Sequence, residues 1–235
     1  MNLLLIIFSL IPVYLILSII YSKDKIEKEP IKLLILTFVG GVISLFLTKF
    51  LATKYQYYLP FLIEENPNLE AYKIFLISFG EIGLIEELCK WLILYIIVWH
   101  NKEFNYIYDA IVYAVFVSLG FATIENFFYL WNTDFTTLIV RSLFTISGHA
   151  FFGIIMGYFF GYAKYYSKME YKYNSFKYMY TSLFSVIILH GLFDYFLSFN
   201  NKYNTFIFIG YTLLLGVIAI TRIKKVENLE LTWDE

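Results

Sequence analysis

Apolar stretches of the sequence contain residues whose side chains can transfer protons or bind metal ions. They include four carboxylic acids, two histidines and a lysine: Glu86, Glu87, Glu125, Asp194, His149, His190 and Lys90. Carboxyl and imidazole groups act as general acids and bases, and they are also zinc ligands. An ionisable group at the centre of a bilayer costs roughly 2.5–3.5 kcal/mol. If these stretches lie in lipid, so many charges require pairing, a water-filled cavity, or both.

Spacing along the chain relates several of these side chains. Glu86 and Lys90 are four residues apart, so we expect them to form an ion pair on one helix face. Glu87 is turned about 100° away and is expected to be the freer carboxylate. His190 and Asp194 are also four residues apart. They can bind one metal ion together, or one can orient the other.

Small residues predict where helices approach one another closely. His149 is followed at intervals of four residues by Gly153, Gly157 and Gly161. Such a stripe lets a neighbouring helix pack against it at short distance. The pair Gly40-Gly41 likewise allows close helix contact in an earlier apolar stretch.

Composition decides the environment of these residues. The chain has 235 residues, of which 60% are hydrophobic and 16% charged, and its mean hydropathy is +0.66. Apolar stretches recur that match the roughly 20 helical residues needed to cross a bilayer. We therefore expect an all-α, polytopic membrane helix bundle. A net charge of −1 gives no indication of nucleic-acid binding, and a single cysteine, Cys89, excludes an intrachain disulfide framework.

About seven membrane spans can be placed by hydropathy. They cover residues 3–20, 33–53, 74–99, 106–131, 137–163, 179–198 and 204–221. The first span has no cationic segment before it and no small-residue cleavage site, so we expect it to be a membrane helix rather than a signal peptide. We expect a single transmembrane domain over residues 1–222 and a polar tail over residues 223–235.

Basic residues predict the orientation. The segments after the first, third and fifth spans, together with the tail, hold twelve lysines and arginines, against four in the segments between them. The positive-inside rule then places the N-terminus outside and the C-terminus in the cytoplasm. The longest outer loop is expected over residues 54–73.

Depth estimates indicate that the polar groups can meet. At about 1.5 Å per residue from the outer end of each span, Glu86 and His149 lie about 18 Å deep and His190 about 12 Å. Glu125 and Asp194 lie about 9 Å and 6 Å deep on the same scale. We therefore expect four helices to direct polar groups into one cavity in the outer half of the membrane.

Four motifs follow one another on four successive spans. They are EELCK (86–90), FATIEN (121–126), GHAFFG (148–153) and HGLFD (190–194). In this order they resemble the PrsW family, within the wider group of Abi/CAAX-type intramembrane proteases. The opening YSKDKIEKEPI is also similar to the first cytoplasmic loop of that family. The resemblance covers essentially residues 1–200.

The resemblance implies a protease of the bacterial cell membrane. PrsW-like proteins are implied to cut single-pass membrane proteins, such as anti-sigma factors, near the outer face. Glu86 and Glu87 match the essential glutamate pair of the family, and His190 with Asp194 matches its last motif. CAAX-type relatives have a histidine at the place of Glu125 and an asparagine at that of Asp194, so their mechanism does not transfer directly.

Peptide hydrolysis needs an activated water, an electrophile for the oxyanion and a proton for the leaving amine. Either glutamate of the EELCK motif fits the general base. In one alternative, His149, His190 and a carboxylate, Asp194 or Glu125, bind Zn²⁺. In the other no metal is bound, and the histidines activate water and donate to the oxyanion. Two histidines with carboxylates suit zinc, so we expect the metal.

The expected site is therefore as follows. The catalytic residues are Glu86, Glu87, Glu125, His149 and His190, and the metal ligands are His149, His190 and Asp194. The expected partners are a single-pass protein substrate and the lipid bilayer, without nucleic acid. Two other classes use the same residues: a transporter or proton-coupled channel, in which they form a relay, and a non-catalytic scaffold on the same fold.

Overall fold

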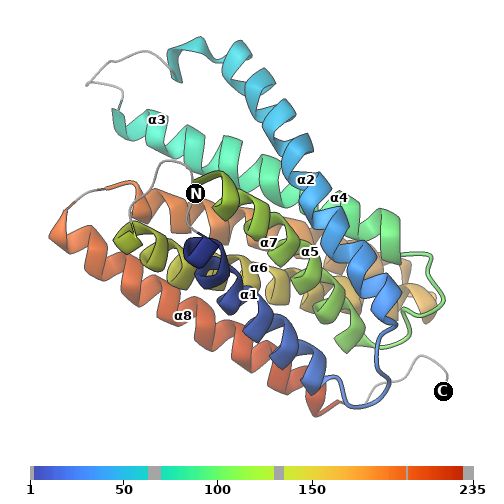
Figure 1. Cartoon of the computed structure of the whole chain (residues 1–235). Helices are drawn as coiled ribbons and strands as arrows, with labels where there is room; N and C mark the ends of the chain where they lie inside the picture. Colours follow the sequence, from blue (N-terminus) through green and yellow to red (C-terminus); the bar gives the residue numbers. More distant parts are fainter. Residues whose placement is uncertain (1–2, 63–69, 130–134, 200, 230–235) are drawn as a thin grey trace.

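The protein is all helical in the parts that the structure describes. The computed structural model describes residues 3–62, 70–129, 135–199 and 201–229. The helices (Figure 1) are α1 (Leu3–Lys23), α2 (Ile31–Tyr58), the one-turn 3₁₀ helix η1 (Pro60–Leu62), α3 (Glu70–Leu76), the π-helix η3 (Ile77–Glu86), α4 (Glu87–Val98), α5 (Ile107–Tyr129), α6 (Phe135–Lys168), α7 (Lys172–Leu197) and α8 (Lys202–Glu227).

Each predicted span overlaps a helical segment of the structure. Helices α3, η3 and α4 follow one another without a break over residues 70–98, and we call this unit the α3–α4 rod. Among the described residues, five helices are long and apolar enough to cross a membrane: α2, α5, α7, α8 and the stretch Ser142–Lys168 of α6. The expected loop over residues 54–73 is wrong at both ends, because α2 continues to Tyr58 and α3 begins at Glu70.

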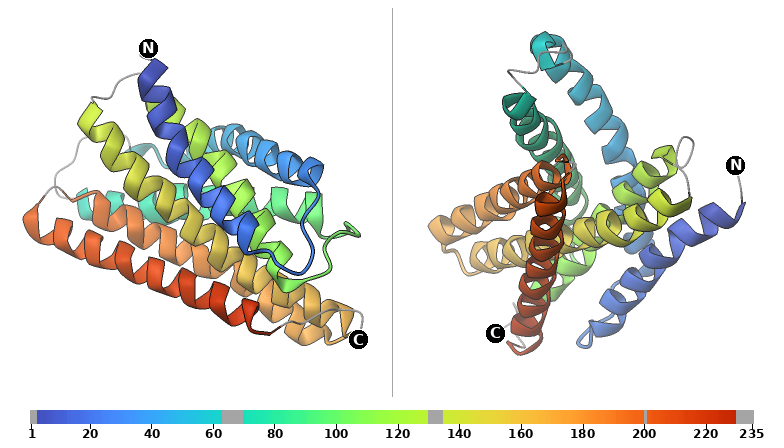
Figure 2. Two further views of the ribbon diagram at one scale, coloured as in Figure 1. Left: turned by 60° about the horizontal axis from the view of Figure 1, so that its bottom comes forward. Right: turned by 90° about the vertical axis from the view of Figure 1, so that its left-hand side faces the viewer.

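Helix α5 forms the centre of the bundle. Its residues from Ile107 to Val115 are all buried, which is the pattern of a helix that is apolar on every face. Helices α2 and α6 pack along it (Figures 1 and 2). Helix α8, by contrast, exposes large apolar side chains such as Leu213 and Val217, as expected of a surface in contact with lipid.

The glycine stripe of α6 packs against α5, as its spacing predicts. A methyl group added at Gly157 would lie 2.5 Å from the carbonyl oxygen of Ala110, and one at Gly161 would lie 2.7 Å from that of Ile107. The two backbones are therefore too close for any side chain at these positions. This contact fixes α6 along α5 and so fixes the height of His149, which precedes the stripe by one turn.

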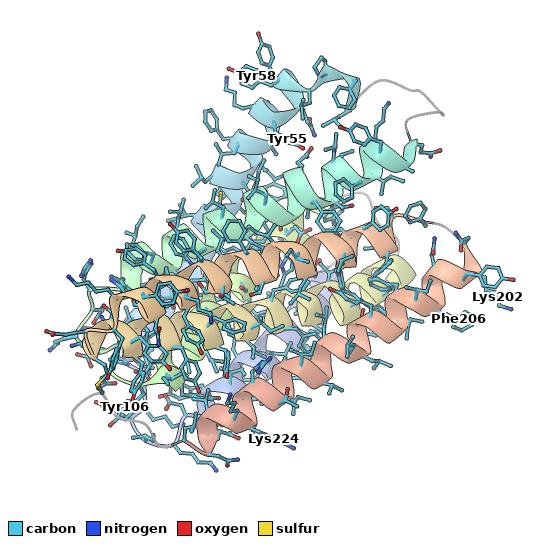
Figure 3. All side chains as sticks on the ribbon, turned by 180° about the vertical axis from the view of Figure 1, so that it is seen from behind. Tyr55, Tyr58, Tyr106, Lys202, Phe206 and Lys224 are labelled. Carbon is cyan, nitrogen blue, oxygen red and sulfur yellow. The ribbon has the colours of Figure 1, made fainter. Side chains whose placement is uncertain are left out.

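The segments rich in basic residues gather at one end of the bundle, as the alternation of spans predicts. At this end, which we call the basic end, Lys23, the last residue of α1, pairs with Glu227 of α8 at 3.0 Å. The hydroxyl of Tyr108 donates to the carbonyl of Ile20 at 3.0 Å. Figure 3 shows Tyr106 and Lys224 at this end and Lys202 at the other.

Two buried acids lie at the basic end, between α1 and α2. Glu29 accepts a hydrogen bond from the hydroxyl of Tyr113 and shares another with Asp109. Burial, reinforced by the charge of Asp109, raises the pKa of Glu29 to about 10. Burial also raises the pKa of Asp24 to about 6. Glu29 therefore carries its proton at neutral pH and can donate it in a hydrogen bond.

Candidate active site

The α3–α4 rod supplies the first three residues of the site. Glu86 is the last residue of the π-helix and Glu87 the first of α4. The Nζ atom of Lys90 lies 3.3 Å from Oε2 of Glu86 and 2.8 Å from Oε1 of Glu87. The expected Glu86–Lys90 ion pair is therefore confirmed.

The expectation that Glu87 is the freer carboxylate is wrong. Its side chain is fully buried, whereas the side chain of Glu86 is 13% exposed. The physical reason is the reach of Lys90, whose four-carbon stem lets one ammonium group contact carboxylates three and four residues earlier on the helix. Glu86 is thus the carboxylate that water can reach.

His149 on α6 links the rod to α5. Its Nδ1 atom lies 3.1 Å from Nζ of Lys90, and its Nε2 atom lies 2.8 Å from Oε2 of Glu125. A lysine ammonium group has only donors, so Nδ1 of His149 accepts and its proton is on Nε2, directed at Glu125. The ring of Phe121 lies 4.0 Å from the same ammonium group, in a cation–π contact.

His190 on α7 lies between two carboxylates. Its Nδ1 atom is 2.7 Å from Oε1 of Glu87, and its Nε2 atom is 3.0 Å from Oδ2 of Asp194. The ring of Phe152 stacks on it at 4.6 Å. The two imidazole rings of His149 and His190 are 5.2 Å apart. These contacts fix the orientation of both histidine rings.

The cluster opens into a cavity of about 660 Å³. Among the site residues, Glu86, Glu125, His149, His190 and Asp194 line it, as expected from the depth estimates. The other walls come from α2, η3, α5, α6 and α7, in their parts distant from the basic end. Helix α2 leans away from α5 toward its C-terminal end (Figures 1 and 2).

The side chains that could share one metal ion differ from the expected set. Among the described residues, ligand atoms of Glu86, Glu87, His149 and His190 all lie within 4.8 Å of one another. Asp194, which we expected as the third ligand, lies outside this group and instead contacts His190. It follows His190 by one helical turn, toward the C-terminal end of α7.

Comparison with known proteins agrees with the metal-binding potential of this cluster. Residues 29–221 match the model of the "PrsW family intramembrane metalloprotease". The chain belongs to the PrsW family. Protease PrsW of Oceanobacillus iheyensis is 36% identical over 214 residues, which cover 91% of this chain and 92% of that relative. Protease PrsW of Bacillus subtilis is 36% identical over 183 residues, 78% of each chain. No solved structure has a significant match.

Membership of the PrsW family makes the chain an intramembrane metalloprotease with bacterial relatives. The donor set fits a divalent cation on two grounds. Four carboxyl groups of the cluster face one ammonium group and two imidazoles, so a bound cation would compensate the excess of negative charge in this partly buried cluster. In addition, Oε2 of Glu87 is buried without a hydrogen-bond partner and remains available as a ligand. The cluster and the family therefore support a metal site, and the expectation that the metal is zinc stays a prediction.

Proposed function

We propose that the enzyme hydrolyses a peptide bond of a single-pass membrane protein, of the anti-sigma-factor type, near the outer membrane face. The observation that carries this proposal is the cluster of Glu86, Glu87, His149 and His190, which opens into one cavity among five helical segments. A cavity of this kind brings water and a peptide to polar groups inside an otherwise apolar bundle.

Glu86 is the general base in this proposal. It lines the cavity, and its side chain is the more exposed of the two glutamates. The Lys90 ammonium group holds it in place at 3.3 Å without removing it from the water-filled space. It takes a proton from the attacking water and passes one to the leaving amine.

Glu87 has a different task, which is to hold the site together. Its Oε1 atom contacts both Nζ of Lys90 and Nδ1 of His190. The Nε2 proton of His149 is directed toward Glu125 on the cavity wall. Protonated imidazole nitrogens on this wall can donate to the oxyanion as it forms.

Zinc is the metal that the donor set suits best, since imidazole and carboxylate are its usual ligands in hydrolytic enzymes. His149 and His190 would hold it, together with Glu87 or Asp194, and Nδ1 of His149 would then exchange its contact with the Lys90 ammonium group for the metal. A bound zinc ion would supply a Lewis acid that polarises the scissile carbonyl. The side chains of the site position the substrate, and Glu86 transfers the protons.

We further propose that the enzyme crosses the cell membrane seven times with its N-terminus outside. The four basic segments lie together at one end, since Lys23 pairs with Glu227, Asn105 bonds to Glu27 and Lys164 bonds to the carbonyl of Trp99. The positive-inside rule places that end in the cytoplasm. The cavity then opens near the outer face, because its lining residues come from the opposite ends of the helices. A substrate would be cut close to where its own span leaves the membrane.

Cleavage in proteoliposomes tests the proposal. The purified enzyme is reconstituted with a single-pass test substrate labelled at both ends, beside its Glu86→Gln variant and a Glu103→Gln control at the basic end. The expected result is two fragments with the wild type and the control, and none with Glu86→Gln. Ion or proton flux without any cleavage would instead support a transporter, and the protease proposal would be wrong.

A further inference from the structure

The π-helix η3 lies directly before the catalytic glutamates. Wide i→i+5 turns are rare and mostly occur as single-turn bulges, often at functional sites. Here the π-helix extends over ten residues, Ile77–Glu86, and α4 follows at Glu87. Each wide turn holds about one residue more than an α-turn, so it changes the direction of every later side chain by about 100°. The π-helix thus decides which way Glu86 and Glu87 point.

Tyr55 on α2 contacts the start of the π-helix. Its hydroxyl donates to the carbonyl oxygen of Leu76 at 3.2 Å. The hydroxyl also occupies the place that a Cβ atom on Gly80 would take. Leu76 and Gly80 are four residues apart, so in an α-helix the amide of Gly80 would bond to that same carbonyl. A side chain inserted beside such a pair competes for the carbonyl and disturbs the α-helical ladder.

Figure 3 shows Tyr55 between α2 and the α3–α4 rod, and Tyr58 at the C-terminal end of α2. The next residue, Gln56, donates through Nε2 to Oε1 of Glu81 at 2.9 Å. Two consecutive residues of α2 therefore hold the first half of the π-helix. The rings of Tyr57 and Tyr58 point away and are about three-quarters exposed.

The other side of the π-helix packs on α7 beside His190. A Cβ atom on Gly83 would lie 2.8 Å from the carbonyl oxygen of Ile187, and one on Gly191 would lie 2.5 Å from the ring of Phe79. The π-helix is thus enclosed between α2 and the turn of α7 that carries His190. A change in its register cannot be absorbed by a shift toward α7 and must appear as rotation of the residues that follow.

We propose that Tyr55 is a positioning residue of the protease, whose hydroxyl keeps residues 77–86 in the wide register that directs Glu86 and Glu87 at the two histidines. This inference rests on the proposed function of those glutamates. Tyr55 does not line the cavity and acts only through the rod. Without its hydroxyl, the carbonyl of Leu76 is released to Gly80, the start of the segment returns to α-helical turns, and the glutamates rotate away.

The variant Tyr55→Phe removes the hydroxyl and keeps the ring, and Tyr58→Phe is the matched control on the same helix. Misplacing a reacting group by about 1 Å costs about 100-fold in rate. We expect kcat of Tyr55→Phe to fall by about that factor, and its metal content to fall with it, because Glu86 and Glu87 leave the two histidines, while KM stays unchanged. Tyr58→Phe should equal the wild type. Gly80→Ala, which forces the hydroxyl out, should lower kcat in the same way.

Cys89, the single cysteine, gives a readout that needs no activity. It is fully buried, two residues after Glu87, so rotation of α4 would expose it to a small thiol reagent such as N-ethylmaleimide. We expect labelling in Tyr55→Phe and none in the wild type or in Tyr58→Phe.

The outcomes separate the two proposals. Wild-type kcat in Tyr55→Phe, or a fall in kcat with Cys89 still protected from N-ethylmaleimide, would overturn the positioning role. If the wild type itself cleaves no substrate, the proposed function fails, and Cys89 labelling alone decides whether Tyr55 sets the register.

Discussion

The ammonium nitrogen of Lys90 lies 3.1 Å from Nδ1 of His149, a residue 59 positions later in the chain. The same nitrogen contacts both glutamates of its own motif. One buried cation therefore joins the rod to α6 and fixes the tautomer of a site histidine. Lys90 is fully buried, so its charge depends on compensation by these neighbours.

Replacing Lys90 by Met keeps most of the stem and removes the charge. The two glutamates then lose their cation, and breaking a buried ion pair from one side costs about 3–5 kcal/mol. We expect Lys90→Met to have a clearly lower thermal midpoint in detergent and no protease activity. Lys102→Met, at a side chain that is 90% exposed, is the control and should behave as the wild type. A stable, active Lys90→Met enzyme would contradict the role of this cation.

Substitution of Glu86 and substitution of Glu87 should have different effects on activity and stability. Glu86→Gln removes the group that faces the cavity, so kcat should fall by about 10²–10⁴-fold while the thermal midpoint stays near that of the wild type. Glu87→Gln weakens contacts to Lys90 and His190, and it should lose stability as well as activity. Thermal unfolding and kcat are measured on both variants. The roles are reversed if Glu86→Gln is the unstable variant and Glu87→Gln the stable, inactive one.

Glu29 predicts a pH dependence of stability at the basic end. Its pKa rises from 4.5 in an unfolded chain to about 10 in the folded protein, chiefly because of burial. Its contribution to stability is therefore complete below about pH 4.5 and is lost as the pH rises toward about 10. Glu29→Gln imitates the protonated acid, so its thermal midpoint should fall less between about pH 5 and about pH 9 than that of the wild type.

The neighbouring exposed residue Glu27 provides the control for this measurement. Glu27→Gln should retain the wild-type decline of the midpoint with pH. An unchanged decline in Glu29→Gln would show that Glu29 does not hold its proton in the folded protein.

Orientation can be measured by labelling single cysteines in intact cells. In a Cys89→Ala background, a cysteine at Lys102 lies at the basic end and one at Tyr58 at the other end; both positions are exposed. A membrane-impermeant maleimide should label position 58 in intact cells and position 102 only after lysis. Labelling of position 102 in intact cells would reverse the proposed topology.

The sequence predicted the helices and the gathering of the site, because both follow from simple spacing. A span of about twenty apolar residues is visible in hydropathy, and a rise of 1.5 Å per residue is enough to place groups at similar depth. Glu125 and His149 were expected to meet on this basis, and their side chains are 2.8 Å apart. The glycine stripe of α6 predicted a close helix contact, and the structure shows that contact with α5.

The contacts that the sequence did not predict depend on the register of the π-helix or on the length of a side chain that reaches another helix. Spacing of four residues relates Lys90 to Glu86 but says nothing of His149 on another helix. The π-helix has no signature in apolar periodicity, and only Gly80 and Gly83 mark the places where neighbours come close. Glu29 lies on a connection between spans, where burial could not be expected. Each of these features arises only from packing.

Metal content is the measurement that tests the central claim most directly. If the Glu–His cluster is the metal centre of a PrsW protease, purified active enzyme should contain about one zinc ion per chain. His190→Ala should lose the zinc, whereas His100→Ala, which changes the one histidine outside the cluster, should keep it. Chelators should inhibit cleavage, and added Zn²⁺ should restore it. Full activity with far less than one metal ion per chain would contradict the metal site, and His149 and His190 would then act directly on water and the oxyanion.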